Sequence, residues 1–373
     1  MGSDPAVTDA PAREKGFVAR HKRVLGSVLF ALAMFGVFYY LVPHFVGLGP
    51  TLRRLRGGNP WWLGLGVPFE ALSIAGYIVL FQGVFSTPEG RIGWGVSYQI
   101  TMAGGLATKL LAAAGSGGVA VTVWALHASG LSAKTVARQM VCFEVVNYSV
   151  YMLAMVIGGL GLWLGLFAGP APIGLTLVPA LLATAVIAFV LSMRWLAEPL
   201  QRYLLRRAEH AGERVGTWLR AAAGAPRALH EGLNSAVALV RGRDRKWLGV
   251  IPAWGFDIGA LWVSFNAFGH SPPGAVLIMG YYVGTLANAL PLPGGIGGVE
   301  GGMIGAFIGF GVTPSLAVLA VLAYRTLSYW LPLLPEGIGY LQLRHTVGDW
   351  RKQTPPSTGA SRDPVAGGVS GGA

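Results

Sequence analysis

Long apolar runs divide this sequence into segments of the length needed to cross a membrane. A run of about 18 or more apolar residues marks a candidate transmembrane helix, because about 20 helical residues span the hydrocarbon core. Such runs cover residues 24–42, 61–85, 136–166, 173–196, 247–268 and 315–343. The pattern predicts an all-α polytopic membrane protein with about six full spans.

Two further apolar regions contain residues that interrupt helices. The region 95–129 contains the run AAAGSGG at 112–118, and the region 274–313 contains PLPGGIGG at 291–298. Proline lacks the backbone N–H that a helix needs, and glycine destabilises a helix interior. Irregular backbone at membrane depth is tolerated only where protein buries it or water reaches it. We therefore expect two broken, re-entrant helical hairpins; the alternative for the second is a tight extracellular loop between two short spans.

The two interrupted regions align with each other at a constant offset of 181 residues. Each follows one span and precedes a long one, and broken helices in inverted repeats are common in secondary transporters. We therefore expect an inverted repeat of about 61–166 and 247–343. The offset pairs Gly117 with Gly298, Ala125 with Ala306, Gly130 with Gly311, Ser132 with Thr313, Glu144 with Arg325 and Tyr148 with Tyr329.

Composition and charge agree with a membrane protein. The chain is 53% hydrophobic and 12% charged, about half the charged fraction of a typical soluble domain. The net charge of +12 comes from basic residues that flank apolar runs, so anionic or phosphate-bearing lipids are the expected partners rather than nucleic acid. A cytosolic N-terminus places 23 of the 28 Lys and Arg residues in cytosolic segments. The positive-inside rule thus predicts both termini in the cytosol, and we expect a multi-pass protein of the plasma membrane.

The polar segments complete the predicted domain organisation. Residues 1–23 are expected to be a disordered cytosolic leader, 24–346 the transmembrane domain, and 347–373 a disordered tail rich in Pro, Gly and Ser. Within 198–246, apolar residues recur at helical spacing among many basic ones. This segment is interpreted as amphipathic helix on the cytosolic membrane surface or, equally, as a soluble structural linker.

Ionisable residues inside the apolar regions are the candidate functional groups. A charge at the bilayer centre costs about 2.5–3.5 kcal/mol or more, so each must be paired, reach a cavity or be neutral. These residues are Glu70, Lys109, Glu144, Asp257, Glu300 and Arg325, with Glu336 near a boundary.

Individual roles follow from the positions of these residues. Glu300 comes directly after the second break and is a candidate protonatable site, cation ligand or partner of Arg325. Glu144 and Arg325 hold equivalent positions in the repeats and are candidates to face each other. Lys109 precedes the first break, where its ammonium could attract a lipid phosphate or snorkel to the interface. For Glu70, Asp257 and Glu144, a structural pair or a hydrogen bond to broken backbone is the competing interpretation.

The sequence shows no motif typical of catalysis or of cofactor binding. It contains no metal-ligand cluster, no catalytic triad and no Walker A pattern, so we expect no metal, no cofactor and no enzymatic activity.

The stretch LPLPGGIGGVEGG and the residues after it resemble a flippase-like membrane family, which includes the transmembrane region of lysylphosphatidylglycerol synthases. The resemblance is carried by Pro293, Gly294, Gly295, Gly297 and Glu300, then by Gly311–Thr313 and Tyr324–Arg325. The first half differs, with Gly115-Ser116-Gly117-Gly118 where members often have a second Pro-Gly-Gly.

This resemblance implies movement of a phospholipid or lipid-linked head group between leaflets. It does not imply synthesis, because the sequence shows no aminoacyl-transfer domain of the kind found in two-domain members. The alternatives are an ion-coupled transporter of a small solute, a membrane enzyme acting on lipid phosphate, and a structural membrane partner of a lipid-modifying enzyme. A homo-oligomer is compatible with each of these functions.

Overall fold

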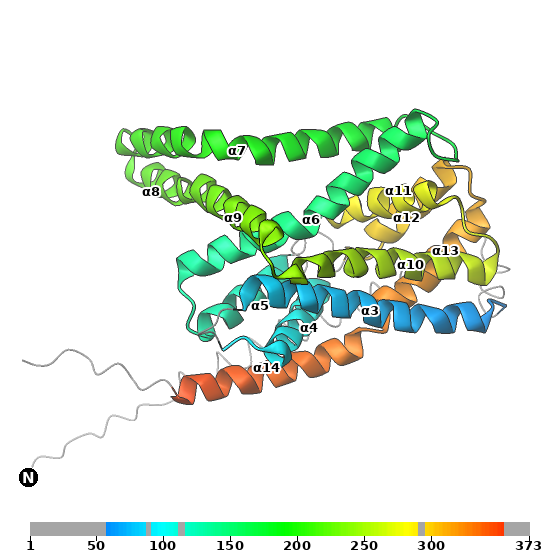
Figure 1. Cartoon of the computed structure of the whole chain (residues 1–373), viewed down its shortest axis with the longest axis horizontal. Helices are drawn as coiled ribbons and strands as arrows, with labels where there is room; N and C mark the ends of the chain where they lie inside the picture. The colour runs from blue at the N-terminus through cyan, green and yellow to red at the C-terminus, as the bar shows by residue number, and fades with distance from the viewer. Residues whose placement is uncertain (1–56, 87–90, 111–115, 290–294, 354–373) are drawn as a thin grey trace, which may run out of the picture.

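A computed structural model describes residues 57–86, 91–110, 116–289 and 295–353 (Figure 1). Every regular element in this part of the chain is helical, which confirms the predicted all-α class. The predicted leader, the first span at 24–42 and the tail from 354 lie outside the described residues. So do Pro293 and Gly294, in the middle of the second break.

Five helical stretches within the described residues are long and apolar enough to cross a membrane. They agree with five of the predicted apolar runs. These are α3 (Pro60–Phe85), α6 (Ala133–Trp163), α7 (Leu177–Glu209), η1 with α10 (Arg245–Phe268), and the last span, Pro314–Trp350.

The α3 and α10 (Val250–Phe268) helices form an antiparallel pair at the centre of the molecule (Figure 1). The Asn59 N–H donates to the Ala267 carbonyl at 2.9 Å, and Ser73 Oγ donates to the Ala253 carbonyl at 2.7 Å. Residues early in α3 therefore meet residues late in α10. The backbones touch at Gly76, where an added Cβ would lie 2.6 Å from the Ala253 nitrogen.

Both interrupted regions are helical hairpins. The first consists of α4 (Trp94–Leu110) and α5 (Ser116–Ala128), and the second of α11 (Gly274–Thr285), η2 (Leu286–Ala289) and α12 (Gly298–Gly309). The 12 residues of α11 or α12 extend about 18 Å, well short of the hydrocarbon thickness of about 30 Å. These lengths favour re-entrant hairpins over pairs of full spans.

The turn that follows each hairpin has the same structure in both halves of the chain. Gly130 and Gly311 adopt left-handed backbone, with φ of 99° and 84°. Ser132 and Thr313 then occupy the N-cap positions of the next helices, α6 and α13 (Pro314–Arg325). The backbone hydrogen bonds are also equivalent: Gly130 to His127, Gly311 to Ile308, Leu131 to Leu126 and Val312 to Phe307.

This repeated turn occurs at the offset of 181 residues found in the sequence, as from Gly130 to Gly311. The helices that open the two predicted halves, α3 and α10, run antiparallel. Both features agree with an inverted repeat, and the bounds 61–166 and 247–343 stay a prediction.

The polar segment 198–246 forms the end of α7, then α8 (Glu213–Ala222) and α9 (Gly224–Arg241). The apolar side of α9 packs against α6, so closely that an added Cβ on Gly232 would lie 2.4 Å from Val141. Leu233 and Ala236 are buried in this contact region. The amphipathic pattern of α9 is thus explained by packing on protein rather than on lipid. In α8, Val215 and Trp218 remain exposed.

The last helix, α14 (Leu333–Gln353), corrects one predicted boundary. The transmembrane domain was predicted to end at 346, with disorder from 347, whereas α14 continues to Gln353. Val347 and Trp350 are buried in the core cluster that includes α3 and α6 residues, and this burial supports the added helical turn.

Candidate functional site

The last span changes its helical winding where it passes the two hairpins. A π-helical turn at Thr326–Trp330 separates α13 from α14, and the Leu331 N–H bonds to the Thr326 carbonyl at 3.0 Å. Pro332, which has no N–H to donate, follows directly. Single π turns are rare and often occur at functional sites. This turn and its flanks carry three residues that contact the hairpins: Arg325, Tyr329 and Glu336.

The second break is joined to the last span through Glu300. Gly297 caps α12 with a φ of 82°, a conformation that favours glycine. One carboxylate oxygen of Glu300 accepts the Gly297 N–H at 2.7 Å, and the other accepts Arg325 Nε at 2.6 Å. The side chains of Glu300 and Arg325 are only 4% and 11% exposed. Of the alternatives for Glu300, the structure shows the ion pair with Arg325.

Gly295 has a steric role beside this pair. Its φ is 65°, and an added Cβ would lie 2.3 Å from the Asn288 side-chain oxygen. Of the predicted glycines, Gly295 and Gly297 therefore allow a tight backbone path into α12.

The first break is joined to the same span through Lys109. Lys109 Nζ lies 2.8 Å from Glu336 Oε1, and the two side chains are 14% and 7% exposed. The close approach of Glu336 to Lys109 depends on Gly105, because a Cβ added at Gly105 would lie 2.6 Å from Glu336 Oε1. Lys109 thus pairs inside the protein instead of snorkelling. Glu336, which the sequence places near a boundary, is part of the site.

Tyr329 connects the two ion pairs. Its ring centroid lies 4.5 Å from Arg325 Cζ and 5.3 Å from Lys109 Nζ, both within cation–π distance. Its hydroxyl donates to the Lys109 carbonyl at 3.3 Å. Tyr329 therefore lies between the ion pair of the first hairpin and that of the second. Sequence reasoning missed this role, and the only signal was the alignment of Tyr329 with Tyr148.

A tyrosine cluster surrounds a further carboxylate, Asp257 on α10. Tyr324 donates a hydrogen bond to Asp257 Oδ1 at 2.9 Å, and Tyr281 donates to Oδ2. The Tyr281 and Tyr324 rings also make an edge contact, and both are buried. Asp257 thus has hydrogen-bond donors on two other helices, α11 and α13.

Two carboxylate oxygens near the site have no hydrogen bond within the described part of the chain. They are Oε2 of Glu70, on α3, and Oε2 of Glu336. Buried polar atoms normally have a partner, so both mark places where a ligand, a proton or water can be accommodated.

Glu144 belongs to neither of the two ion pairs. Arg325 is paired with Glu300, and Glu144 lies near Asn147 on the same helix. That Glu144 and Arg325 face each other stays a prediction.

The arrangement has the chemistry of an anion site kept neutral by internal carboxylates. Two cations, Lys109 and Arg325, are each held by one glutamate in surroundings that are mostly protein. Burying such charges is costly unless they are paired, so removal of either glutamate requires a substitute anion. No group of three or more metal-ligating side chains is found in the described ranges.

Comparison with known proteins shows extensive similarity to one membrane family. The family described as the lysylphosphatidylglycerol synthase TM region matches residues 24–335. A UPF0104 membrane protein of Methanothermobacter thermautotrophicus is 40% identical over 82 residues, which is 22% of this chain and 23% of that protein. Another UPF0104 protein of this organism is 32% identical over 114 residues, 28% of this chain and 34% of that protein. The matched stretches thus cover about a quarter to a third of these relatives.

Proposed function

This chain belongs to the lysylphosphatidylglycerol synthase transmembrane-region family, and we propose that it translocates a phospholipid or lipid-linked head group between membrane leaflets. The observation that carries the proposal is the position of Tyr329 between the Lys109–Glu336 and Arg325–Glu300 pairs, each of which joins one hairpin to the last span. A head group crossing the membrane needs polar partners at mid-depth, and broken helices commonly supply them.

Glu300 occupies a position suited to a lipid phosphate. Its carboxylate lies at the N-terminal end of α12 and accepts both a backbone N–H and the Arg325 guanidinium. Helix N-termini and arginines are both typical phosphate-binding groups. In the proposed cycle a lipid phosphate competes with Glu300 for these donors. Protonation of Glu300, or a cation that binds it, would favour the phosphate.

The Lys109–Glu336 pair offers the phosphate a second cation. Lysine donates hydrogen bonds in three directions, and a phosphate can replace the single contact to Glu336. Tyr329, placed between the cations, would guide the phosphate from one to the other. The lipid tails would remain in the bilayer throughout.

Translocation of this kind forms and breaks no covalent bond, so the proposal makes the chain a transporter and not an enzyme. Its partners are membrane lipids with anionic or phosphate-bearing head groups. The proposed location is the plasma membrane, and the distribution of Lys and Arg supports both termini in the cytosol.

Leaflet exchange of fluorescent phospholipids in proteoliposomes tests the proposal. The comparison includes the wild type, Glu300→Gln, Arg325→Ala and the control Glu209→Gln, which alters an exposed glutamate at the end of α7. We expect exchange faster than in empty vesicles for the wild type and the control, and much slower exchange in the other two variants at equal reconstitution. Wild-type exchange no faster than in empty vesicles, with every phospholipid tried, would contradict a translocase and favour a solute transporter or a structural partner.

A further inference from the structure

A polar cavity of about 430 Å³ lies between α7 and α9, far along the chain from the two breaks. Its volume is within the range of small-molecule sites, about 300–1,000 Å³. The cavity is lined by Glu198, Gln201 and Arg202 of α7 and by Arg227, His230 and Glu231 of α9.

The cavity lies where the surface of α7 changes from apolar to charged. The apolar part of α7 ends near Trp195 and Leu196, whose side chains are 75% and 48% exposed. Exposed tryptophan at the end of a span is typical of the membrane–water interface. The cavity begins within the next turn, at Glu198, so the exposed tryptophan places it near the membrane–water interface.

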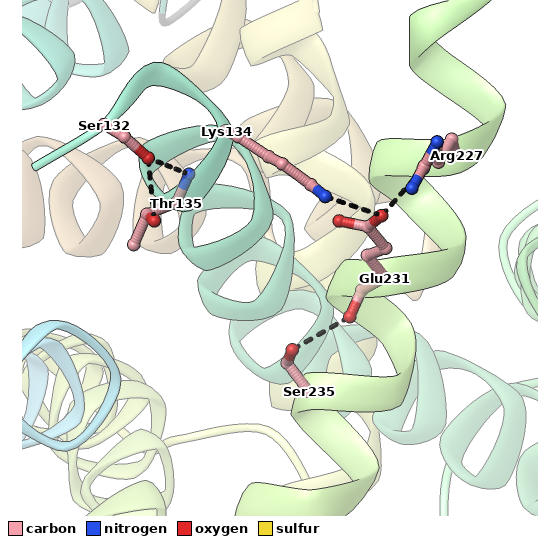
Figure 2. Close-up of polar contacts among 6 residues, drawn as sticks. All are labelled: Ser132, Lys134, Thr135, Arg227, Glu231 and Ser235. Carbon is pink, nitrogen blue, oxygen red and sulfur yellow. Dashed lines mark hydrogen bonds and ion pairs between the residues drawn. The ribbon is translucent and has the colours of Figure 1, made fainter.

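Two ion pairs lie at the α9 wall of the cavity. Arg227 Nε and Lys134 Nζ, from α6, approach the same oxygen of Glu231 at 2.8 Å and 3.7 Å (Figure 2). The hydrogen bond from Arg227 keeps the pKa of Glu231 below its usual range, so this carboxylate is charged at neutral pH. Ser132 is the N-cap of α6, the helix that carries Lys134, and its hydroxyl accepts a hydrogen bond from the Thr135 N–H.

The α7 wall carries two charged groups without such partners. Glu198 and Arg202 are one helical turn apart, and neither forms an ion pair with a residue that the structure describes. His230 adds a polar atom, because its Nδ1 is buried without a hydrogen bond inside the described ranges. The cavity thus presents a carboxylate, a guanidinium and an imidazole that are available to a ligand.

We propose that this cavity binds the head group of a membrane lipid that carries both a phosphate and a primary amine. Arg202 and Arg227 hold the phosphate, and Glu198 accepts hydrogen bonds from the ammonium group. A purely anionic head group would lie against the carboxylates of Glu198 and Glu231, which is unfavourable. A quaternary amine has no N–H to donate. The site is separate from the Glu300–Arg325 pair and does not depend on translocation.

Binding of short-chain lipids to the purified full chain in a maltoside detergent tests this assignment by calorimetry. We expect dihexanoyl phosphatidylethanolamine to bind more tightly than the phosphatidylcholine and phosphatidylglycerol of equal chain length. Soluble O-phosphoethanolamine should bind more weakly than the lipid, because the cavity adjoins the exposed apolar surface of α7. If O-phosphoethanolamine bound as tightly as the lipid, the assignment to a membrane lipid would be overturned.

Substitutions on α7 separate this site from general charge attraction. We expect Arg202→Gln and Glu198→Gln each to weaken phosphatidylethanolamine binding by about tenfold, the loss of one charge-assisted hydrogen bond. Arg206→Gln removes the same charge one turn further along α7, outside the cavity, and should bind as the wild type does. Equal losses in Arg202→Gln and Arg206→Gln, or unchanged binding in Glu198→Gln, would overturn the proposal.

Discussion

Arg325 Nε lies 2.6 Å from Glu300 Oε1, and this contact joins the helix after the second break to the last span. The Lys109–Glu336 pair does the same at the first break, with the charges reversed. In one pair the hairpin supplies the anion, and in the other it supplies the cation. The last span therefore contacts both hairpins through ion pairs that lie on either side of its π turn.

Breaking the Glu300–Arg325 pair on one side should lower the folding stability. Removing one partner of a buried ion pair leaves the other without its counter-charge, which costs about 3–5 kcal/mol. We expect Glu300→Gln and Arg325→Gln each to lower the thermal unfolding midpoint clearly in detergent. The double variant should lose less than the sum of the two single losses, because neither charge is left alone. Additive losses would show that the two side chains do not interact.

Gly105 gives a steric test of the first pair. Alanine there would place a Cβ 2.6 Å from Glu336 Oε1 and push the carboxylate away from Lys109. We expect Gly105→Ala to lower both the unfolding midpoint and lipid exchange. Gly64→Ala, on α3, is the matched control, because a Cβ added at Gly64 would have no neighbouring atom within 4 Å. A stability of Gly105→Ala equal to that of Gly64→Ala would argue against the close contact.

The ring of Tyr329 should contribute more to lipid exchange than its hydroxyl does. The ring lies beside Arg325 and Lys109, whereas the hydroxyl makes one long hydrogen bond of 3.3 Å. Cation–π contacts contribute about 0.5–2 kcal/mol each, depending on burial. We expect Tyr329→Phe to retain most exchange activity and Tyr329→Leu to lose it. The reverse order would assign the function to the hydroxyl.

Because the turn is repeated, substitution of either of two distant glycines should lower the folding stability by a similar amount. Alanine at Gly130 or at Gly311 must adopt left-handed backbone, which costs about 1–2 kcal/mol. Since the turns have φ values of 99° and 84° and equivalent hydrogen bonds, the two losses should be similar in thermal unfolding. Asparagine, which tolerates this conformation better, should cost less than alanine at both positions. A loss at only one of them would separate the two turns.

Much of the fold could be predicted from the sequence, because it depends on local rules. Run length identifies the spans, and proline and glycine mark the interruption of α11 and α12. The equivalence of Gly130 and Gly311 was visible as identity at one offset, and the structure gives both the same backbone conformation. The extension of α14 was missed because Val347 and Trp350 are isolated apolar residues, and only tertiary packing shows that they are buried.

The site was less predictable, since its contacts join distant parts of the chain. Glu300 and Arg325 were candidates for pairing because each needed compensation in an apolar segment. Lys109 and Glu336 are 227 positions apart. Nothing in the sequence predicts the close approach of their side chains, which the absence of a Cβ at Gly105 permits. The cation–π role of Tyr329 depends on the same packing.

The most direct test of the central claim, that both breaks form one site, is a double-variant cycle in lipid exchange. Phospholipid exchange rates would be measured in proteoliposomes for Lys109→Gln, Arg325→Gln and the combined variant. If a single site uses both cations, the combined variant should lose no more activity than the more severe single variant, because effects of residues that act together are not additive. Losses that multiply in the combined variant would show two independent sites and contradict the account.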